Sequence, residues 1–351
     1  MSERASGATS VAVVSTGGTI ASLHAEGAKG VTAVLPLEEL LRRAGGSALP
    51  QIGAVVDLAR VNSWNVDPPL MWEVAVTVER LAAQNDVAGV VVTHGTDTLE
   101  ETAFLVDVLV DTDKPVVFTA AMRAADEMSS DGPHNLRSAL RAAASPVLND
   151  LGTLVCLDGR LQAARWVRKW HTHSTAAFSS SDSPPVATLD PDGVVRRMYG
   201  DLPRWRVPGG VAGRQPRSDD VPVLQAYSGM TARAAHALVE ATSPRGLVID
   251  GFGLGHVPEA LRDAIEHLVA TGVIIAVSTR VPTGGTWEVY GGPGGGTDLA
   301  HLGVVGAGGL SAGKARLLLL ACLADHDQTK ARQLFLDGVT VLGRGAENRT
   351  P

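Results

Sequence analysis

Two glycine-containing turns carry hydroxyl side chains that could attack a carbonyl carbon. Thr19 and Thr96 each follow a glycine, and residues 13–19 match residues 90–96 at five of seven positions. A threonine hydroxyl becomes an effective nucleophile when a base removes its proton, and backbone N–H groups of such a turn can stabilise an oxyanion. The two turns therefore suit covalent hydrolysis, although Thr19 could instead cap the segment that follows it.

Asp97 and Lys169 are the charged residues that could serve these hydroxyls. Asp97 could hold a cationic group of a ligand, or it could be the N-cap of the next helix, with Glu100 completing a capping box. The chain has five lysines against 25 arginines, so a lysine at position 169 is an unusual choice. Lysine can act as a base where arginine cannot, and the alternative is a solvated basic loop.

Other patterns give weaker signals. Residues 251–256 resemble a dinucleotide-binding glycine motif, but the third glycine stands one place early. His171 and His173 have no neighbouring cysteine or carboxylate cluster in the sequence, so we predict no metal site there. The chain has no Cys-x-x-Cys motif, which leaves thiol-redox chemistry without support.

Short β-branched runs that alternate with segments of helical period would position these residues. We predict strands at residues 11–15, 89–93, 115–119 and 153–157, and helices at residues 69–83, 98–110 and 135–144. This alternation is typical of a parallel sheet covered by helices on both faces. Ligands of such sheets bind beyond the carboxyl ends of strands where the strand order reverses. Thr19 and Thr96 would face one pocket if their strands are neighbours there.

The 351-residue chain is long enough for one large or two packed domains. Residues 204–222 are polar and rich in Pro and Gly, so we predict a linker between an N-terminal catalytic α/β domain (residues 1–203) and a C-terminal α/β domain (residues 223–351). Residues 291–296, five glycines and a proline, are predicted to form a mobile loop. Further elements are predicted in the second half, with strands at 221–225, 246–250 and 273–278 and helices at 231–241, 258–270 and 311–324.

Composition excludes several classes of protein. Hydrophobic residues make up 45% of the chain and charged residues 19%, which rules out a disordered chain. The net charge of −7, without runs of like charge, argues against a nucleic-acid or anionic-membrane surface. No apolar run reaches the ~18 residues of a membrane span, and no secretory signal is visible. The two cysteines, Cys156 and Cys322, offer no disulfide framework, so we expect a cytoplasmic protein.

Taken together, these motifs resemble the bacterial-type L-asparaginases, the asparaginase/glutaminase family of amidohydrolases. The resemblance rests on blocks at residues 16–22, 93–102, 120–123, 131–136, 158–160 and 280–285. It implies an α/β, two-domain asparaginase-like fold with a larger N-terminal parallel-sheet domain and a smaller C-terminal α/β domain. It also implies hydrolysis of a side-chain amide without a metal or organic cofactor, in a homo-oligomer (dimer or tetramer) whose sites lie between subunits.

The resemblance assigns roles to five residues of this chain. It implies that Thr19 is the nucleophile that forms an acyl-enzyme and releases ammonia. Thr96 and Lys169 are implied as the second hydroxyl and the base of a Thr-Lys-Asp relay. Asp97 would complete that relay and bind the α-ammonium group of the substrate, and Ser63 matches the serine that binds the α-carboxylate.

Two departures from the family pattern alter the expected site. The family places a catalytic tyrosine on the loop after the first strand, where this chain has residues 28–33 and no tyrosine. We hypothesise that Tyr290 of a neighbouring subunit supplies the missing hydroxyl, since a hydroxyl bonded to the nucleophile would help to activate it. Leu254 stands where the family often has a substrate-binding asparagine, so amine recognition would rest more on Asp97 and Glu288. We therefore expect weak or altered substrate affinity.

The main interpretation is hydrolysis of L-asparagine to L-aspartate and ammonia. A glutaminase–asparaginase of mixed specificity and a component of a tRNA amidotransferase are alternatives within the fold. The latter normally carries an extra N-terminal region, and the strand beginning at Val11 comes too early to leave room for it. A catalytically impaired amino-acid-binding protein is the alternative from another class.

Overall fold

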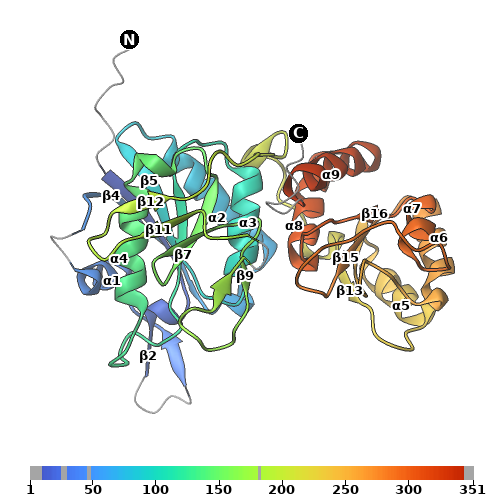
Figure 1. Cartoon of the computed structure of the whole chain (residues 1–351), viewed down its shortest axis with the longest axis horizontal. Coiled ribbons are helices and arrows are strands. Elements are labelled where there is room, and N and C mark those ends of the chain that lie inside the picture. Colours follow the sequence, from blue (N-terminus) through green and yellow to red (C-terminus); the bar gives the residue numbers. More distant parts are fainter. Residues whose placement is uncertain (1–9, 25–29, 46–48, 181–182, 344–351) are drawn as a thin grey trace, which may run out of the picture. The chain divides into compact units, whose positions relative to one another are not determined.

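The computed structural model describes residues 10–24, 30–45, 49–180 and 183–343. The chain forms two compact units, one comprising Met1–Ser180 with Pro184–Leu202 and the other Ser181–Ser183 with Pro203–Pro351. Each unit has its own sheet, and each is described by itself below (Figure 1).

The first unit is built on an eight-stranded sheet in the order β12-β11-β8-β7-β6-β5-β1-β4. The strands are β1 (Ser10–Gly17), β4 (Ile52–Val61), β5 (Val87–Thr93), β6 (Val116–Thr119), β7 (Thr153–Leu157), β8 (Arg160–Ala163), β11 (Ala187–Leu189) and β12 (Val195–Arg197). The strand pairs β4–β1, β1–β5, β5–β6 and β6–β7 are parallel. Strands β8, β11 and β12 extend the sheet beyond β7 through antiparallel pairs. The sheet is therefore mixed.

Strand β1 lies where the strand order reverses. It pairs with β4 on one side and with β5 on the other. These are the next two strands of this sheet along the chain, so the chain crosses from one side of β1 to the other between them. All eight residues of β1 are buried, as expected for a central strand with helices on both faces. The carboxyl ends of β1 and β5 thus meet at the kind of crevice where open α/β sheets bind ligands.

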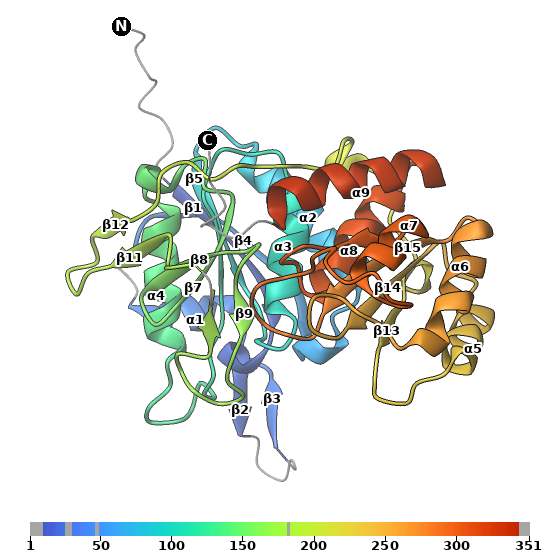
Figure 2. The ribbon, with the colours of Figure 1, turned by 45° about the vertical axis from the view of Figure 1, so that its right-hand side comes forward.

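Four helices cover the two faces of this sheet (Figures 1 and 2). They are α1 (Leu37–Ala44), α2 (Pro68–Ala82), α3 (Leu99–Leu109) and α4 (Gly132–Ala143). Helices α1 and α4 contact each other and bury one set of alternate strand side chains, including Val11 and Val13. Helices α2 and α3 contact each other on the other face, and α2 begins at the N-cap Asp67, whose carboxylate accepts the N–H of Leu70.

Two short hairpins extend from the first unit. One pairs β2 (Ser22–His24) with β3 (Val31–Ala33), and the other pairs β9 (Arg168–Lys169) with β10 (Phe178–Ser179). The second hairpin carries Lys169, one of the predicted site residues.

The second unit has a four-stranded parallel sheet in the order β13-β14-β15-β16. Its elements are β13 (Val223–Gln225), α5 (Ala232–Thr242), β14 (Gly246–Gly251), α6 (Arg262–Ala270), β15 (Ile274–Thr279), α7 (Gly296–His301), β16 (Val305–Gly306), α8 (Ala312–Leu323) and α9 (Gln328–Leu342). The core on one face includes Leu247, Ile249, Ile265 and Ile275. The predicted fold class, a larger N-terminal unit and a smaller C-terminal α/β unit, is confirmed.

The predicted linker, residues 204–222, groups with the second unit and contains two 3-10 turns, Gly210–Ala212 and Ser218–Asp220. Arg316 of helix α8 donates to the carbonyls of Val221 and Ser218, both at 2.8 Å. The domain boundaries themselves stay a prediction. The glycine-rich stretch 291–296 forms a loop as far as Gly295, and Gly296 begins helix α7.

Within the described residues, no helix is both long and apolar enough to cross a bilayer. No group of three or more His, Cys, Asp or Glu residues in the described ranges is arranged to hold a metal ion.

Candidate active site

The first turn of the candidate site follows strand β1 and depends on glycine. Gly17 and Gly18 have positive φ angles of 100° and 80°, a region that residues with a side chain rarely adopt. The N–H of Gly18 donates to the Val61 carbonyl at 3.0 Å, and the Ser22 hydroxyl donates to the Gly18 carbonyl at 3.0 Å. These bonds fix the turn between β1 and the edge strand β4.

Thr19 is half-buried at the tip of this turn. The N-cap of the 3-10 turn Thr19–Ala21 is Gly18, and no side chain caps it, so the alternative that Thr19 serves as a cap is wrong. Across the described part of the chain, the Thr19 hydroxyl has no hydrogen-bond partner. It is therefore available to a ligand.

The second turn follows strand β5 and contains a buried histidine. The Nδ1 atom of His94 lies 2.8 Å from the Gly95 carbonyl, and its Nε2 lies 3.0 Å from the Thr102 hydroxyl. Burial lowers the pKa of His94 to about 4, so the ring is neutral near pH 7. Because a carbonyl can only accept, Nδ1 carries the proton and Nε2 accepts from Thr102. The imidazole thus anchors the turn to helix α3.

The two turns touch through their backbones. A Cβ atom placed on Gly18 would lie 2.3 Å from the Cα of Gly95. Just before the turns, Ser15 of β1 is in register with Thr93 of β5, and the Thr16 hydroxyl donates to the Thr93 carbonyl at 3.2 Å. The two strands are therefore neighbours, which is the condition set for a shared pocket, whereas the shared pocket for both hydroxyls stays a prediction.

Lys169 connects the second turn to the β9–β10 hairpin. Its Nζ lies 2.8 Å from the Thr96 hydroxyl oxygen and 2.7 Å from Oδ1 of Asp97. The Lys169 side chain is 19% exposed and that of Asp97 is 44% exposed, so the ion pair is only partly shielded from water. The main-chain N–H of Lys169 also donates to the Glu100 carboxylate. The solvated-loop alternative for Lys169 is therefore wrong.

Asp97 is engaged by side chains rather than by the helix that follows it. Helix α3 has Thr98 as its N-cap, and the Glu100 carboxylate bonds to Lys169, so the predicted capping box is wrong. The Ser63 hydroxyl accepts the N–H of Asp97 at 3.0 Å and lies 3.5 Å from its Oδ2. The carboxylate therefore faces two predicted site residues, Lys169 and Ser63.

Ser63 comes from a third strand end, the 3-10 turn Ser63–Asn65 after β4. It is only 3% exposed, and its carbonyl accepts the Thr98 hydroxyl at 2.7 Å. A Cβ atom on Gly95 would lie 2.6 Å from the Ser63 hydroxyl oxygen, so the turn packs directly on this residue. The ends of β1, β4 and β5 thus converge on one place.

Two residues that the sequence reasoning did not assign support the neighbouring loop. The Asp131 carboxylate accepts the N–H groups of Met122 and Arg123 at 3.0–3.1 Å and the Asn135 amide at 3.1 Å. Asn135 also donates to the Ala120 carbonyl at 2.9 Å. These bonds fix the loop after β6, and their signal in the sequence was the spacing of Asp131 and Asn135, one helical turn apart.

Tyr290 and Glu288 belong to the second unit. Both are exposed, and the Tyr290 ring packs edge-on against His256 with centroids 5.0 Å apart. Leu254 lies beside the same loop, since its carbonyl accepts the Trp287 N–H at 3.0 Å. A role for Tyr290 and Glu288 beside Thr19 stays a prediction.

Residues 309–313, Gly-Leu-Ser-Ala-Gly, match the Gly-x-Ser-x-Gly pattern of serine hydrolases. That pattern requires a strained turn that exposes the serine. Here Ser311 has a relaxed backbone (φ −63°, ψ 159°) and is the N-cap of α8, accepting the Lys314 N–H at 3.4 Å. The serine therefore has a capping role.

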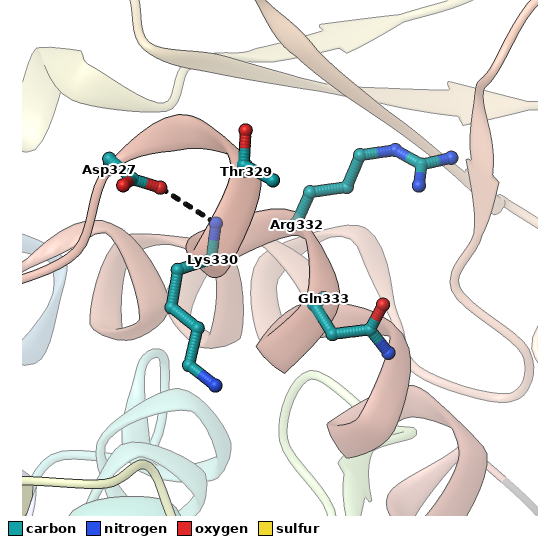
Figure 3. A pocket seen from close by; sticks show the side chains of 5 residues that line it. All are labelled: Asp327, Thr329, Lys330, Arg332 and Gln333. Carbon is teal, nitrogen blue, oxygen red and sulfur yellow. Dashed lines mark hydrogen bonds between the residues drawn. The ribbon is translucent and has the colours of Figure 1, made fainter.

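A hollow of about 470 Å³ lies on the first turns of α9 (Figure 3). Its lining residues are Asp327, Thr329, Lys330, Arg332 and Gln333. Asp327 is the helix N-cap and accepts the Lys330 N–H at 2.8 Å, while the Lys330 and Arg332 side chains extend in different directions. These five residues include no nucleophile paired with a base, so the converging strand ends of the first unit remain the candidate active site.

Comparison with known proteins places this architecture in a class. Residues 10–199 match the family model described as "Asparaginase, N-terminal", and residues 220–335 match "Glutaminase/Asparaginase C-terminal domain". The solved structure of a probable cytoplasmic L-asparaginase from Campylobacter jejuni superimposes with a TM-score of 0.80 at 28% identity, covering 93% of this chain and 99% of that one. The fold is thus that of a two-domain amidohydrolase.

Two curated proteins are similar to this chain over more than nine-tenths of its length. A probable L-asparaginase of Deinococcus radiodurans is 35% identical over 342 residues, covering 94% of this chain and 98% of the relative. A component of the glutamyl-tRNA(Gln) amidotransferase of Haloquadratum walsbyi is 32% identical, covering 93% of this chain and 74% of the relative. The chain belongs to the asparaginase family, as its motifs indicated.

Proposed function

We propose that this protein hydrolyses L-asparagine to L-aspartate and ammonia through a threonine acyl-enzyme. The observation that carries the proposal is the position of Lys169 Nζ, 2.8 Å from the Thr96 hydroxyl and 2.7 Å from the Asp97 carboxylate. This group lies on the turn whose Gly95 contacts Gly18, the residue before Thr19. A hydroxyl, an amine and a carboxylate in series can accept and return a proton.

In the proposed reaction, Asp97 and Ser63 bind the α-ammonium and α-carboxylate groups of asparagine. The Thr19 hydroxyl attacks the side-chain amide carbon, and its proton passes to the Thr96–Lys169–Asp97 relay. The tetrahedral intermediate collapses as the C–N bond breaks, and the relay returns the proton to the departing ammonia. Water then attacks the acyl-enzyme, releases aspartate and restores the Thr19 hydroxyl.

The Gly18 N–H donates to Val61, so we infer that another N–H of the first turn supports the charge that develops on the amide oxygen. The positive φ values of Gly17 and Gly18 turn the chain sharply before Thr19. N–H groups in such a turn can point toward an oxyanion, and one oxyanion donor is worth ~3 kcal/mol in related chemistry.

Glutamine is the second candidate substrate, since a pocket for one extra methylene discriminates by only ~1–3 kcal/mol. The amidotransferase relative motivates a further alternative, supply of ammonia to a partner enzyme. A non-catalytic amino-acid-binding protein is the remaining alternative. Steady ammonia release from asparagine by the purified chain alone distinguishes the proposed enzyme from the last two.

The test is an ammonia-release assay with asparagine, glutamine and a few other amides. We expect turnover of asparagine and its loss in Thr19→Ala. Thr271→Ala is the matched control, because Thr271 is the C-cap of helix α6 in the second unit and its hydroxyl donates to the nearby Leu268 carbonyl. Equal turnover by Thr19→Ala and wild type would refute the proposed nucleophile.

We further propose a cytoplasmic homo-oligomer in which Tyr290 and Glu288 of a neighbouring subunit complete the site. The free, buried Cys156 and Cys322 are compatible with a reducing compartment. The exposure of Tyr290, at 60%, leaves its hydroxyl accessible to a second copy. Light scattering gives the oligomeric state, and Tyr290→Phe with unchanged turnover would exclude the tyrosine.

A further inference from the structure

The hairpin that carries Lys169 has little regular structure of its own. Strands β9 and β10 pair over only two positions, Lys169 with Phe178 and Arg168 with Ser179. Beyond them, the N–H groups of residues 170 and 171 both donate to the Ala177 carbonyl, at 2.7 and 3.3 Å. Two short strands are marginal by themselves, so the order of this hairpin depends on contacts beyond the strand pairing.

Three side chains bond to the backbone of the hairpin: Ser174 accepts the N–H of Ala176, Trp170 donates to the Ser179 carbonyl, and His171 makes two bonds across the tip. The Nδ1 atom of His171 accepts the N–H of His173 at 3.2 Å and the N–H of Ser174 at 3.0 Å. An acceptor that receives N–H groups two and three residues ahead is the arrangement of an Asx turn, which aspartate or asparagine usually provides. Here the imidazole takes that place.

This arrangement requires one protonation state of His171. Because Nδ1 accepts from two donors, it has no proton, and the ring proton is on Nε2. A proton on Nδ1 would abolish its capacity to accept, and the N–H groups of His173 and Ser174 would lose these two hydrogen bonds.

The titratable groups near His171 belong to the hairpin or lie at its base. His171 is exposed, and the titratable side chain in contact with it, among the described residues, is His173, with ring centroids 4.4 Å apart. The charged groups nearer the base of the hairpin are Lys169, paired with Asp97, and Glu100, which accepts the Lys169 N–H. His173 Nδ1 lies 3.2 Å from the neighbouring Thr172 hydroxyl.

We propose that His171 is a positioning residue: its Nδ1 acceptor closes the turn at the tip of the β9–β10 hairpin and thereby holds the Lys169 amine against Thr96 and Asp97. The catalytic part of this statement rests on the proposed function. The structural part, that Nδ1 of His171 orders the hairpin, stands independently of it.

Three variants separate acceptor chemistry from packing. His171→Ala removes the acceptor. His171→Asn restores it, because the Asn side-chain oxygen accepts N–H groups in the same positions. His173→Asn is the matched control, since it removes the neighbouring ring without removing the acceptor.

Two measurements are made on each purified variant. Hydrogen–deuterium exchange of peptides covering residues 168–179 reports the order of the hairpin, expressed as protection relative to unstructured peptide. Steady-state kinetics with asparagine report kcat and KM. We expect His171→Ala to lose protection across the hairpin and to lower kcat about fivefold to tenfold, with KM changed less than about twofold, as for two lost hydrogen bonds. His171→Asn and His173→Asn should stay within about twofold of wild type.

Wild-type protection in His171→Ala, or equal loss in His173→Asn, would overturn the proposal. If the wild type releases no ammonia, the proposed function fails, and the exchange data alone still decide whether His171 orders the hairpin.

Discussion

Gly18 and Gly95 approach so closely that no side chain fits between them: a Cβ on Gly18 would lie 2.3 Å from the Gly95 Cα and 2.5 Å from its nitrogen. Each glycine stands directly before a threonine proposed for catalysis. The contact therefore sets the separation of two hydroxyl-bearing turns that are far apart in the sequence. Catalysis depends on the placement of the reacting groups, so this contact bears directly on the proposed reaction.

Gly18→Ala should destabilise the first unit and abolish ammonia release. The new Cβ meets backbone atoms that cannot rotate away, in addition to the strain of φ +80°, so we expect a loss of at least ~3 kcal/mol in the free energy of unfolding. Gly229→Ala is the matched control, because its φ is +78° and nothing lies within 4 Å of the added Cβ. The control should lose only ~1 kcal/mol. Equal losses in urea unfolding would mean that the contact with Gly95 is not the cause.

Lys169→Met should lower kcat for asparagine by at least ~100-fold while the protein stays folded, since a positioned base contributes 10²–10⁴-fold. The substitution keeps most of the side-chain volume and removes the amine that contacts Thr96 and Asp97. Lys330→Met is the control, because Lys330 lines the hollow on α9 in the second unit. Retention of more than a tenth of wild-type turnover by Lys169→Met would remove the lysine from the mechanism.

The sequence predicted the central strands and helices because their patterns are local. Residues 11–15 and 89–93 are continuous β-branched runs, which is typical of strands buried on both faces. Strand β4 was not predicted: it lies at the sheet edge, none of its ten residues is fully buried, and its residues give no such run. Helix α9 was also not predicted from the sequence.

The site was only partly predictable for a related reason. The turns at Thr19 and Thr96 can be recognised in the sequence because both have the same order of threonine and glycine residues after an apolar run. The family resemblance implied Lys169 as the partner of Asp97, but local patterns alone did not, since the choice between a helix cap and an ion pair depends on a residue 72 positions away. Likewise, the bond from Glu100 to the Lys169 N–H joins residues 69 apart. Local capping rules predicted the wrong partner in both cases, because a tertiary contact took their place.

His94 should make the first unit less stable as the pH falls from neutral. Burial lowers its pKa to about 4 from an ordinary value of 6.5. Between these values the unfolded chain binds a proton that the folded chain does not, so the free energy of unfolding decreases as pH drops and levels off below about 4. The full contribution is roughly 3 kcal/mol.

A difference measurement isolates this histidine from the others. Urea unfolding of wild type and His94→Gln between pH 4 and 7 should give profiles that converge toward low pH, because the variant has no group to protonate. The variant is expected to be less stable at pH 7, since it loses the bonds to Gly95 and Thr102. Parallel profiles would show that the His94 imidazole is protonated equally in both states.

Both thiols should be inert in the folded protein. Cys156 lies on β7 and Cys322 on α8, each with no exposed surface, and burial raises the pKa of both, that of Cys156 to about 12. The thiolate is the reactive form, so a thiol-specific disulfide reagent at pH 8 should react with neither cysteine under native conditions and with both in denaturant. Because the two residues lie in different units, their exposure rates in intermediate urea report which unit opens first. Reaction of Cys156 in native buffer would mean that the central sheet opens readily, which its fully buried position between β6 and β8 argues against.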